Sequence, residues 1–343
     1  MTGDIKDIQV YDTLIFILDD KNKLFVFNKD GKFRNYIGKT GNGPGEYLAI
    51  RAFCVDKFSR QIIVFDNMNY AYFLYDIDGT FKSKINIESN YNESPMKMMM
   101  INQQSLLVYY ALYKENTAYK LFDFLSQKEI QTKHYQYANC TSFIYSFSKH
   151  PITVSENNTA TIIMPLCDTL FQCSNNELIS KYIIQHSNQI APIVTSEFNR
   201  EYNPVTLGIQ YTKDGLFTGF NGIFEIKDKI LLYIGFIDGG NLYFIVDKNK
   251  MDGSYHVFSS VGNINSENIN SNHTSHKELT CMPFFKPSET DGNYLVSYVM
   301  PYNLINLQGK INSEQDANLS KLNNLVNTVN EEDNPVLFFY KLK

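Results

Sequence analysis

The sequence lacks tryptophan, has no apolar run of 18 or more residues, and shows no large excess of charge of either sign. Without such a run we expect no transmembrane helix. The 31 basic and 36 acidic residues are spread along the chain and give a formal net charge of −5. This distribution offers no basic patch for nucleic acid or for an anionic membrane surface, so we expect neither as a partner.

The motifs of the common hydrolases and metalloenzymes are also missing. The chain contains no Gly-x-Ser-x-Gly elbow, no His-Glu-x-x-His pair and no Cys-x-x-Cys pair, and therefore shows no recognisable nucleophile or metal centre. The closely spaced histidines His273 and His276 lie in a segment rich in Asn and Ser, which would not fix two rings around Zn²⁺. We expect no catalytic residue, no metal site and no cofactor.

Cysteine is scarce, and the number of cysteines is odd. Four of the five lie within or beside apolar runs, which indicates buried thiols. Cys167 and Cys173 are close enough in sequence to face each other across a hairpin, so a disulfide between them stays open. The redox compartment is therefore undetermined. The first residues show no basic segment followed by an apolar one, so no secretion signal is visible in the sequence. The cysteines are Cys54, Cys140, Cys167, Cys173 and Cys281.

The sequence is rich in aromatic residues and contains an internal repeat. Aromatic side chains make up 14% of the sequence, with 24 Tyr and 25 Phe, and half-buried strands favour them. An apolar strand, an Asp/Asn turn, a second strand, an Asp-Gly turn and a third strand run through residues 17–33 and return through 64–81, so that Phe81 follows Phe33 by 48 residues. Repeats of this length with four short strands predict propeller blades. The predicted fold is all-β, a six-bladed β-propeller of four-stranded antiparallel blades with a short helical insertion near the C-terminus.

The expected blades form a single domain and cover residues 5–38, 48–87, 96–135, 143–185, 222–260 and 281–343. The first strand of the fourth blade is ambiguous between 143–147 and 152–154, and 187–219 is interpreted as an insertion with a short helix over 196–202. Apolar spacings of three and four predict a helix over 316–329. In the sixth blade, the strand from Pro335 would be the third, after strands over 282–285 and 294–300, which leaves that blade one strand short. Either the natural N-terminus has been removed, in which case we expect a longer parent protein with an extended segment before Met1, or the ring closes poorly.

The link between the first two blades, Gly38 to Tyr47, contains four Gly and one Pro, which predicts a shaped loop without helix or strand. Exposed N–H groups of Gly-rich turns can bind anions, but the loop lacks the Lys-Ser/Thr ending of a phosphate loop. A structural link is therefore favoured. Propeller ligands usually bind at the loop-rich face or in the channel, so Glu46, Tyr47 and Arg51 are the candidate ligand-binding residues. The structural alternative is an Arg51–Glu46 ion pair.

The first turn of each repeat carries a carboxylate and an amide. These are Asp19 and Asn22 in the first copy, and Asp66 and Asn69 in the second. Oxygen atoms of this kind could hold Ca²⁺. A metal site does not require an Asp and an Asn in every blade, however, whereas the capping of a turn in every blade does. The recurrence of these residues therefore favours a structural role in the turns.

The pattern Gly38-x-x-Gly41-x-Gly43-Pro44-Gly45-Glu46-Tyr47, followed by Asp66-x-x-Asn69 and Asp78-Gly79, resembles the NHL-type repeat. More narrowly, the chain resembles a bacterial six-bladed β-propeller family of uncharacterised proteins with NHL-like or TolB-like blades. Segments 168–171, 294–300 and 331–337 add to the resemblance, whereas the Arg that usually follows the repeat's Asn in NHL proteins is missing from both copies. The resemblance implies export to the periplasm or cell surface of a bacterium, as a lipoprotein.

Three functions from different classes are consistent with these features. The first is a non-enzymatic module that binds a peptide, glycan or protein partner through a loop-rich, Tyr-containing face, because Tyr and Asn give contact area and adaptable hydrogen bonds. The alternative is a Ca²⁺-dependent hydrolase, lactonase-like, or a lyase acting at the central channel. The third is a scaffold with no small-molecule ligand that docks through the helix over 316–329. The ligand and the oligomeric state stay open.

Overall fold

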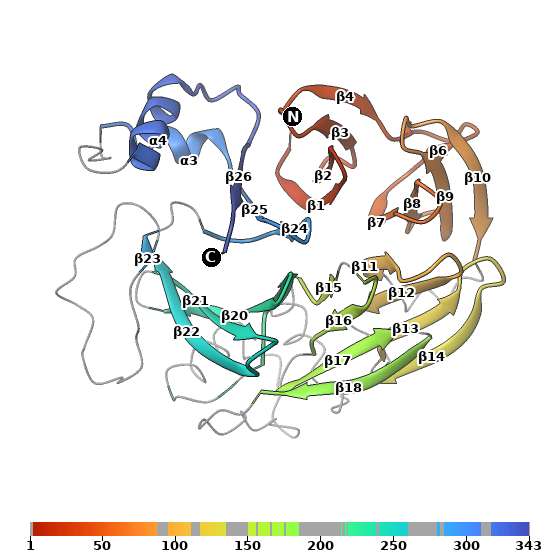
Figure 1. Cartoon of the computed structure of the whole chain (residues 1–343). Helices are drawn as coiled ribbons and strands as arrows, with labels where there is room; N and C mark the ends of the chain where they lie inside the picture. The colour runs from red at the N-terminus through yellow and green to blue at the C-terminus, as the bar shows by residue number, and fades with distance from the viewer. Residues whose placement is uncertain are drawn as a thin grey trace. The chain divides into compact units, whose positions relative to one another are not determined.

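The computed structural model describes residues 3–87, 95–110, 117–134, 150–155, 157–164, 167–174, 176–184, 214, 217, 219–237, 240–259, 280–281, 285–309 and 317–342. The fold is a six-bladed β-propeller built mainly of four-stranded antiparallel blades, as the repeat predicted (Figure 1). The chain divides into two compact units, one of Asp4–Glu225 and one of Ile226–Lys343 together with Met1–Gly3.

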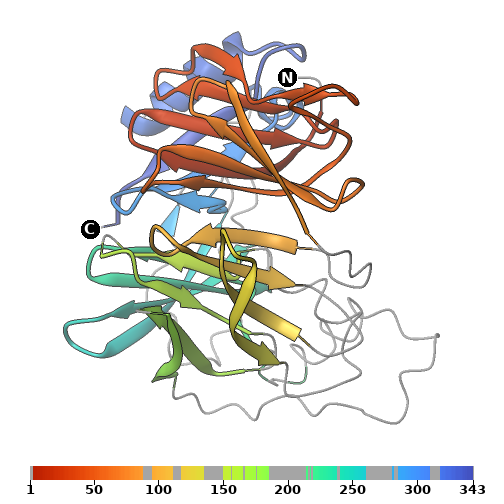
Figure 2. The same cartoon turned by 90° about the vertical axis from the view of Figure 1, so that its right-hand side faces the viewer.

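The first unit contains four complete blades whose strands follow one another in sequence order. Their antiparallel strands are seen from the side in Figure 2, where the N-terminal blades are drawn red to orange. Blade 1 has β1 (Ile5–Tyr11), β2 (Leu14–Asp19), β3 (Leu24–Asn28) and β4 (Phe33–Tyr36); blade 2 has β7 (Ile50–Asp56), β8 (Gln61–Asp66), β9 (Ala71–Asp76) and β10 (Phe81–Asn86); blade 3 has β11 (Pro95–Met100), β12 (Ser105–Tyr110), β13 (Thr117–Asp123) and β14 (Lys128–His134); blade 4 has β15 (Ile152–Val154), β16 (Ala160–Ile162), β17 (Thr169–Ser174) and β18 (Glu177–Ile183).

The remaining two sheets depart from the four-stranded pattern. The fifth has the order β19 (Gly222–Ile226), β20 (Lys229–Ile237), β21 (Gly240–Asp247), β22 (Asp252–Ser259) and β23 (Thr280–Cys281), with β23 parallel to β22. The sixth has the order β24 (Glu289–Thr290), β25 (Leu295–Val299) and β26 (Val336–Tyr340). Between β25 and β26 lie the helices α3 (Pro301–Ile305) and α4 (Ala317–Thr328). Among the residues that the structure describes, the last blade has three strands and helix α4 lies near the C-terminus, as predicted.

Several details of the prediction need correction. The Gly-rich link contains two short strands, β5 (Lys39–Thr40) and β6 (Glu46–Tyr47), which pair in parallel. The first strand of blade 6 is β24, not 282–285, since Phe285 lies in no strand and 282–284 fall outside the described residues. Helix α3 and strand β23 were not expected. The first strand of blade 4 is β15, while the alternative at 143–147 and the helix expected over 196–202 lie outside the described residues.

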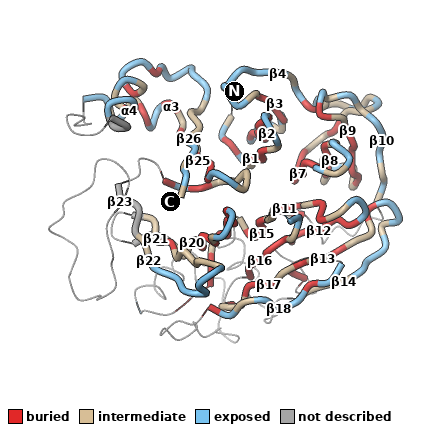
Figure 3. The backbone as a smooth tube through the Cα atoms, in the orientation of Figure 1, coloured by how far each residue is buried: buried red, intermediate tan, exposed pale blue. Residues whose placement is uncertain are grey.

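The core of the first unit lies between successive blades because side chains of a strand alternate between its two faces. Phe16 and Val26 of blade 1 pack with Phe53 and Val64 of blade 2. The opposite face of blade 2 packs in the same way on blade 3, through residues such as Phe65. Burial falls off in the outer strands β4, β10, β14 and β18, which are largely exposed or half-buried (Figure 3). Each blade therefore depends on its neighbour to cover its apolar face.

Buried tyrosines add hydrogen bonds to this packing. Tyr75 is fully buried and its hydroxyl donates to the carbonyl oxygen of Gly45, at 3.1 Å. Tyr119 of blade 3 is also buried and its hydroxyl donates to the carbonyl oxygen of Ile163 in blade 4, at 2.6 Å. Burial raises the pKa of both hydroxyls, so that they stay protonated as donors. Some of the tyrosine residues that the sequence suggested for a recognition face are therefore buried and hold blades together.

Candidate functional site

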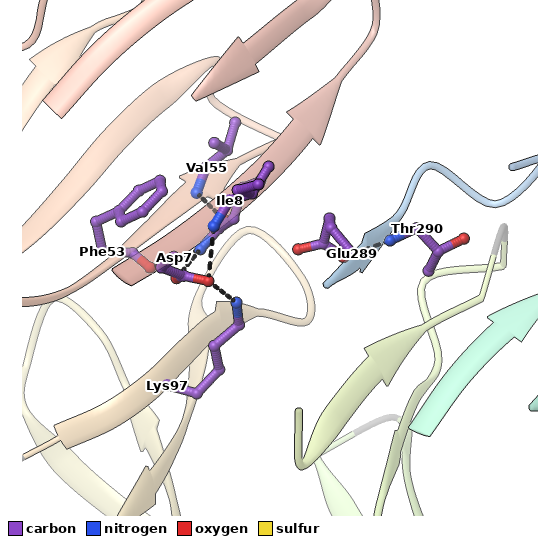
Figure 4. A network of polar contacts seen from close by, with 8 residues as sticks. Asp7, Ile8, Phe53, Val55, Lys97, Glu289 and Thr290 are labelled. Carbon is purple, nitrogen blue, oxygen red and sulfur yellow. Dashed lines mark hydrogen bonds and ion pairs between the residues drawn. The ribbon is translucent and has the colours of Figure 1, made fainter. Parts of the chain in front are cut away.

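The first strand of each blade is the innermost one in a propeller, so its side chains are the natural candidates for a site. In the first unit, the strands β1 and β11 carry the oppositely charged side chains Asp7 and Lys97 (Figure 4). The Lys97 ammonium lies 2.7 Å from Asp7 Oδ1, and the two side chains are only 8% and 18% exposed. Asp7 Oδ1 also accepts a hydrogen bond from the backbone N–H of Ile8, at 3.0 Å. This partly buried ion pair joins blade 1 to blade 3.

Gln9 joins β1 to the first strand of blade 2. Its side-chain amide donates to the carbonyl oxygen of Phe53, at 2.8 Å, and its Oε1 accepts from the N–H of Val55, at 2.9 Å. Both ends of the amide are thus bonded to the backbone of β7, and Gln9 is buried. A buried backbone N–H or carbonyl needs such a partner, so Gln9 stabilises the contact between the two blades.

A third buried polar group lies in β19. The carboxylate of Glu225 accepts from the hydroxyl of Thr161, at 3.0 Å, and the N–H of Glu225 donates to the hydroxyl oxygen of Thr153, at 2.9 Å. All three residues are buried. Because buried polar groups require hydrogen bonds, the two threonines of blade 4 account for the presence of this acid. It is bonded to the protein rather than presented to a substrate.

The loop between blades 1 and 2 encloses its own carboxylate. Glu46 Oε2 accepts from the N–H of Gly43 at 2.8 Å, and Glu46 Oε1 lies 2.8 Å from the ammonium of Lys39. The interaction with Lys39, followed by that with Gly43, lowers the pKa of Glu46. A Cβ atom on Gly41 would lie 1.9 Å from Glu46 Oε2, so the Glu46 carboxylate would have to move if a side chain were introduced there. The N–H of Gly43 is thus bound by a carboxylate of the loop itself, and the cation paired with Glu46 is Lys39, not Arg51.

Tyr47, the second candidate, lies in the core between blades 1 and 2. It is 1% exposed, and its hydroxyl donates to the carbonyl oxygen of Ile37, at 3.2 Å. Burial raises the pKa of this hydroxyl. In this arrangement Tyr47 contributes packing and a structural hydrogen bond.

Arg51, the third candidate, is half-buried and lies on β7. Its Nη2 donates to the sulfur of Met96 in β11. Its Nε is buried and has no hydrogen-bond acceptor. Of the three candidate residues, Arg51 is therefore the one that has a buried donor without an acceptor.

The repeated aspartates are turn residues, as their recurrence predicted. Asp66 accepts from the N–H groups of Leu48 and Met68, at 2.6 and 2.9 Å, and from the side-chain amide of Asn69, at 2.7 Å. Asp19 accepts from the N–H groups of Lys21 and Lys23, at 3.0 and 2.8 Å. Asn22 instead accepts from the ammonium of Lys6, at 3.4 Å. In the described part of the chain, no three His, Cys, Asp or Glu side chains gather in a way that could hold a metal ion.

Three of the five cysteines are shown as free thiols. Cys54, Cys167 and Cys173 are all buried, and burial raises their pKa, that of Cys173 to about 12. Cys173 lies in β17, and Cys167 precedes the same strand, so the hairpin arrangement that would have brought the two sulfurs together does not occur. His273 and His276 lie outside the described residues.

The sequence interpretation missed Asp7, Gln9, Lys97 and Glu225. A signal was present, because Asp7, Gln9 and Glu225 interrupt apolar runs that were predicted to be inner strands, and Lys97 directly precedes the predicted inner strand 98–101. Polar residues are seldom buried without partners, so their position in such runs indicates a paired polar group. It does not identify the partner, since Asp7 and Lys97 are 90 residues apart.

Comparisons with known proteins place the chain among proteins of this fold. Residues 1–341 match the model of a family described as "Domain of unknown function (DUF4934)", and no curated protein sequence matches. A Bacteroides fragilis protein of known crystal structure, named "Putative exported protein", is 18% identical, with a TM-score of 0.66 over 100% of this chain and 92% of that one. That likeness shows a shared fold.

Two weaker similarities are to other crystal structures. A member of the duf4221 family from Bacteroides vulgatus is 8% identical, with a TM-score of 0.48 over 74% of this chain and 81% of that one. Virginiamycin B lyase from Staphylococcus aureus is 13% identical, with a TM-score of 0.43 over 76% of this chain and 71% of that one. Neither helix within the described ranges has the length and apolar character needed to cross a membrane.

Proposed function

The chain belongs to the DUF4934 family of domains of unknown function, and from its side chains we propose that it is a non-enzymatic binding module that is exported from the cell. The proposal rests on the observation that polar side chains of the inner strands are bonded to other residues of the protein. Asp7 is paired with Lys97, and Glu225 is bonded to Thr161. A general base or a metal ligand must be able to reach a substrate or an ion. These groups are instead bonded to neighbouring blades.

Binding through a rigid scaffold fits this use of polar groups. The buried ion pair, the Gln9 amide and the hydroxyl of Tyr119 each connect one blade to another, which fixes the positions of the loops between strands. Loops held by a rigid scaffold are where proteins commonly carry binding residues. The expected ligand is a peptide, a glycan or a partner protein.

The proposal of export has two supports. The repeat resembles that of an exported bacterial propeller family, and the B. fragilis protein that shares the fold over the whole chain carries the name "Putative exported protein". We place the protein in the periplasm or at the cell surface, anchored as a lipoprotein. Cell fractionation after expression of the complete natural gene tests this: the protein should follow the envelope fraction, and recovery with soluble cytosolic markers would contradict export.

The binding function is tested with the full chain on arrays of glycans and peptides, in parallel with assays of ester, lactone and polysaccharide cleavage in the presence of CaCl₂ or EDTA. We expect saturable binding of at least one class of ligand, unchanged by EDTA, and no turnover. Ca²⁺-dependent hydrolysis or elimination of a bound ligand would overturn the proposal in favour of an enzyme.

A further inference from the structure

The first strands of blades 1, 2 and 3 carry a bulge at the same position. The pairing register shifts between Ile5 and Asp7 in β1, between Ile50 and Ala52 in β7, and between Pro95 and Lys97 in β11. The bulged residues are Lys6, Arg51 and Met96, which follow one another at intervals of 45 residues. Bulges redirect side chains and are frequent next to functional sites.

The three bulged side chains have different environments. Lys6 is exposed, and its ammonium lies 3.4 Å from Asn22 Oδ1. Arg51 is half-buried, and the acceptor that the structure gives it is the thioether sulfur of Met96. A thioether is a weak acceptor, whereas a guanidinium has five N–H donors. The cation of blade 2 is therefore paired with a neighbour that satisfies it poorly.

The Nε atom of Arg51 is a donor that lacks a hydrogen-bond acceptor. It is buried, and an unpaired buried donor is uncommon and costs free energy. Glu46 and Asp56 are equally near to Arg51 along the chain; Glu46 is held by Lys39 and Gly43, and Asp56 accepts from the N–H of Phe58 and the hydroxyl of Ser59. The carboxylate of Asp7 is held by Lys97. These three carboxylates are thus bonded to groups other than Arg51.

We propose that Arg51 recognises the carboxylate group of a small acidic ligand, which takes the place of the Met96 sulfur. This inference rests on the proposed binding function and adds the chemical class of the ligand. A planar guanidinium matches a carboxylate through two parallel hydrogen bonds. One unpaired guanidinium balances one negative charge, and this favours a carboxylate over a phosphate, which carries about −1.5 to −2 at neutral pH. Met96 is suited to move, because its unbranched side chain adopts many conformations.

The test is calorimetric titration of the full chain with matched probes. Sodium galacturonate is compared with galactose, and a short peptide with a free C-terminus is compared with its amidated form, so that the two sources of a carboxylate are distinguished. We expect the acidic member of at least one pair to bind and neither neutral member to bind. Sodium acetate should compete with the acidic probe. Absence of binding by galacturonate, by the acidic peptide and by acetate would overturn the inference.

Variants assign the binding to Arg51. Arg51→Gln should weaken binding of the acidic probe by about tenfold or more, and Arg51→Lys, which keeps the charge but loses the planar fork, should weaken it nearly as much. Lys6→Gln removes one positive charge from the equivalent position of blade 1 and should change affinity by less than about twofold. Equal losses in the Arg51 and Lys6 variants would indicate general electrostatic attraction and contradict a specific site. Unaltered melting curves of the Arg51→Lys variant show that it is folded.

The outcomes separate this inference from the proposed function. If the arrays yield a neutral ligand whose affinity does not change in Arg51→Gln, the protein is a binding module and the carboxylate site is wrong. If the acidic probe is cleaved rather than held, the non-enzymatic function is wrong, whatever Arg51 contributes to affinity.

Discussion

Replacing Lys97 by methionine keeps an unbranched side chain of similar length and removes its charge, which leaves the Asp7 carboxylate without its cation. The ammonium and Asp7 Oδ1 are 2.7 Å apart, with side-chain exposures of 8% and 18%. Removal of one partner of a buried ion pair typically costs 3–5 kcal/mol, because the other charge stays behind uncompensated. Asp7 keeps some contact with water, so we expect Lys97→Met to lower the free energy of unfolding by about 3 kcal/mol.

A double-mutant cycle shows whether this loss belongs to the pair. Asp7→Asn alone should cost about 2 kcal/mol, because it leaves the Lys97 ammonium buried. The double variant should cost no more than Lys97→Met alone, since both charges are then gone, which gives a coupling free energy of about 2 kcal/mol. Urea unfolding can be followed by tyrosine fluorescence, as the chain has no tryptophan and 24 tyrosines.

The exposed pair of Lys32 and Asp30 provides the matched control. Their side chains are 79% and 52% exposed, and exposed pairs add little to stability, so Lys32→Met should leave the urea midpoint unchanged. If Lys97→Met also leaves the midpoint unchanged, or if the effects of the two single variants at Asp7 and Lys97 simply add, the inner-strand ion pair does not hold the blades as argued.

Three further predictions follow from the described contacts. The interactions with Lys39 and then Gly43 lower the pKa of Glu46 in the folded protein. They therefore stabilise the fold fully above the ordinary pKa of 4.5, and this contribution is lost as the pH falls through the lower pKa of the folded protein. The amide resonance of Gly43 should accordingly titrate below pH 4.5. Tyr119→Phe removes a donor to a carbonyl of the next blade and should cost about 1–2 kcal/mol in urea unfolding; no change would contradict its structural role. Cys54 is buried, and burial raises its pKa, so peptide mapping after maleimide treatment should find it labelled only in the unfolded chain; labelling of the native chain would show that β7 opens readily.

Strand positions were predictable from the sequence because they depend on local patterns. In blades 1 and 2 the apolar runs and the Asp turns between them predict strands over 5–10, 14–18, 24–27, 33–37, 52–55, 61–65, 71–75 and 81–87. These bounds lie within about two residues of the observed ends of β1 to β4 and β7 to β10. The turn role of Asp66 followed in the same way, since an aspartate side chain caps the N–H groups of residues just after it. Strand β24 was misplaced, because its two residues carry no alternating apolar pattern.

The site was less predictable because its contacts join distant residues. Nothing near Asp7 in sequence points to Lys97, and the choice of Lys39 rather than Arg51 as the partner of Glu46 depends on how the loop closes. Tyr47 looked suitable for binding by its position after a Gly-rich loop, but the fold buries it between two blades. The bulge that sets Arg51 apart is a property of strand pairing, so it could not be seen before the register was known.

Calorimetric titration of the full chain with CaCl₂ tests most directly whether the inner-strand polar groups serve the protein itself. A Ca²⁺ ion at the inner strands would have to take the Asp7 carboxylate from Lys97. We expect no heat of binding that depends on Asp7, and the same trace for the native chain and for Asp7→Asn. Stoichiometric binding with a Kd of about 10 μM or tighter that disappears in Asp7→Asn would show that this carboxylate is a metal ligand and contradict the account.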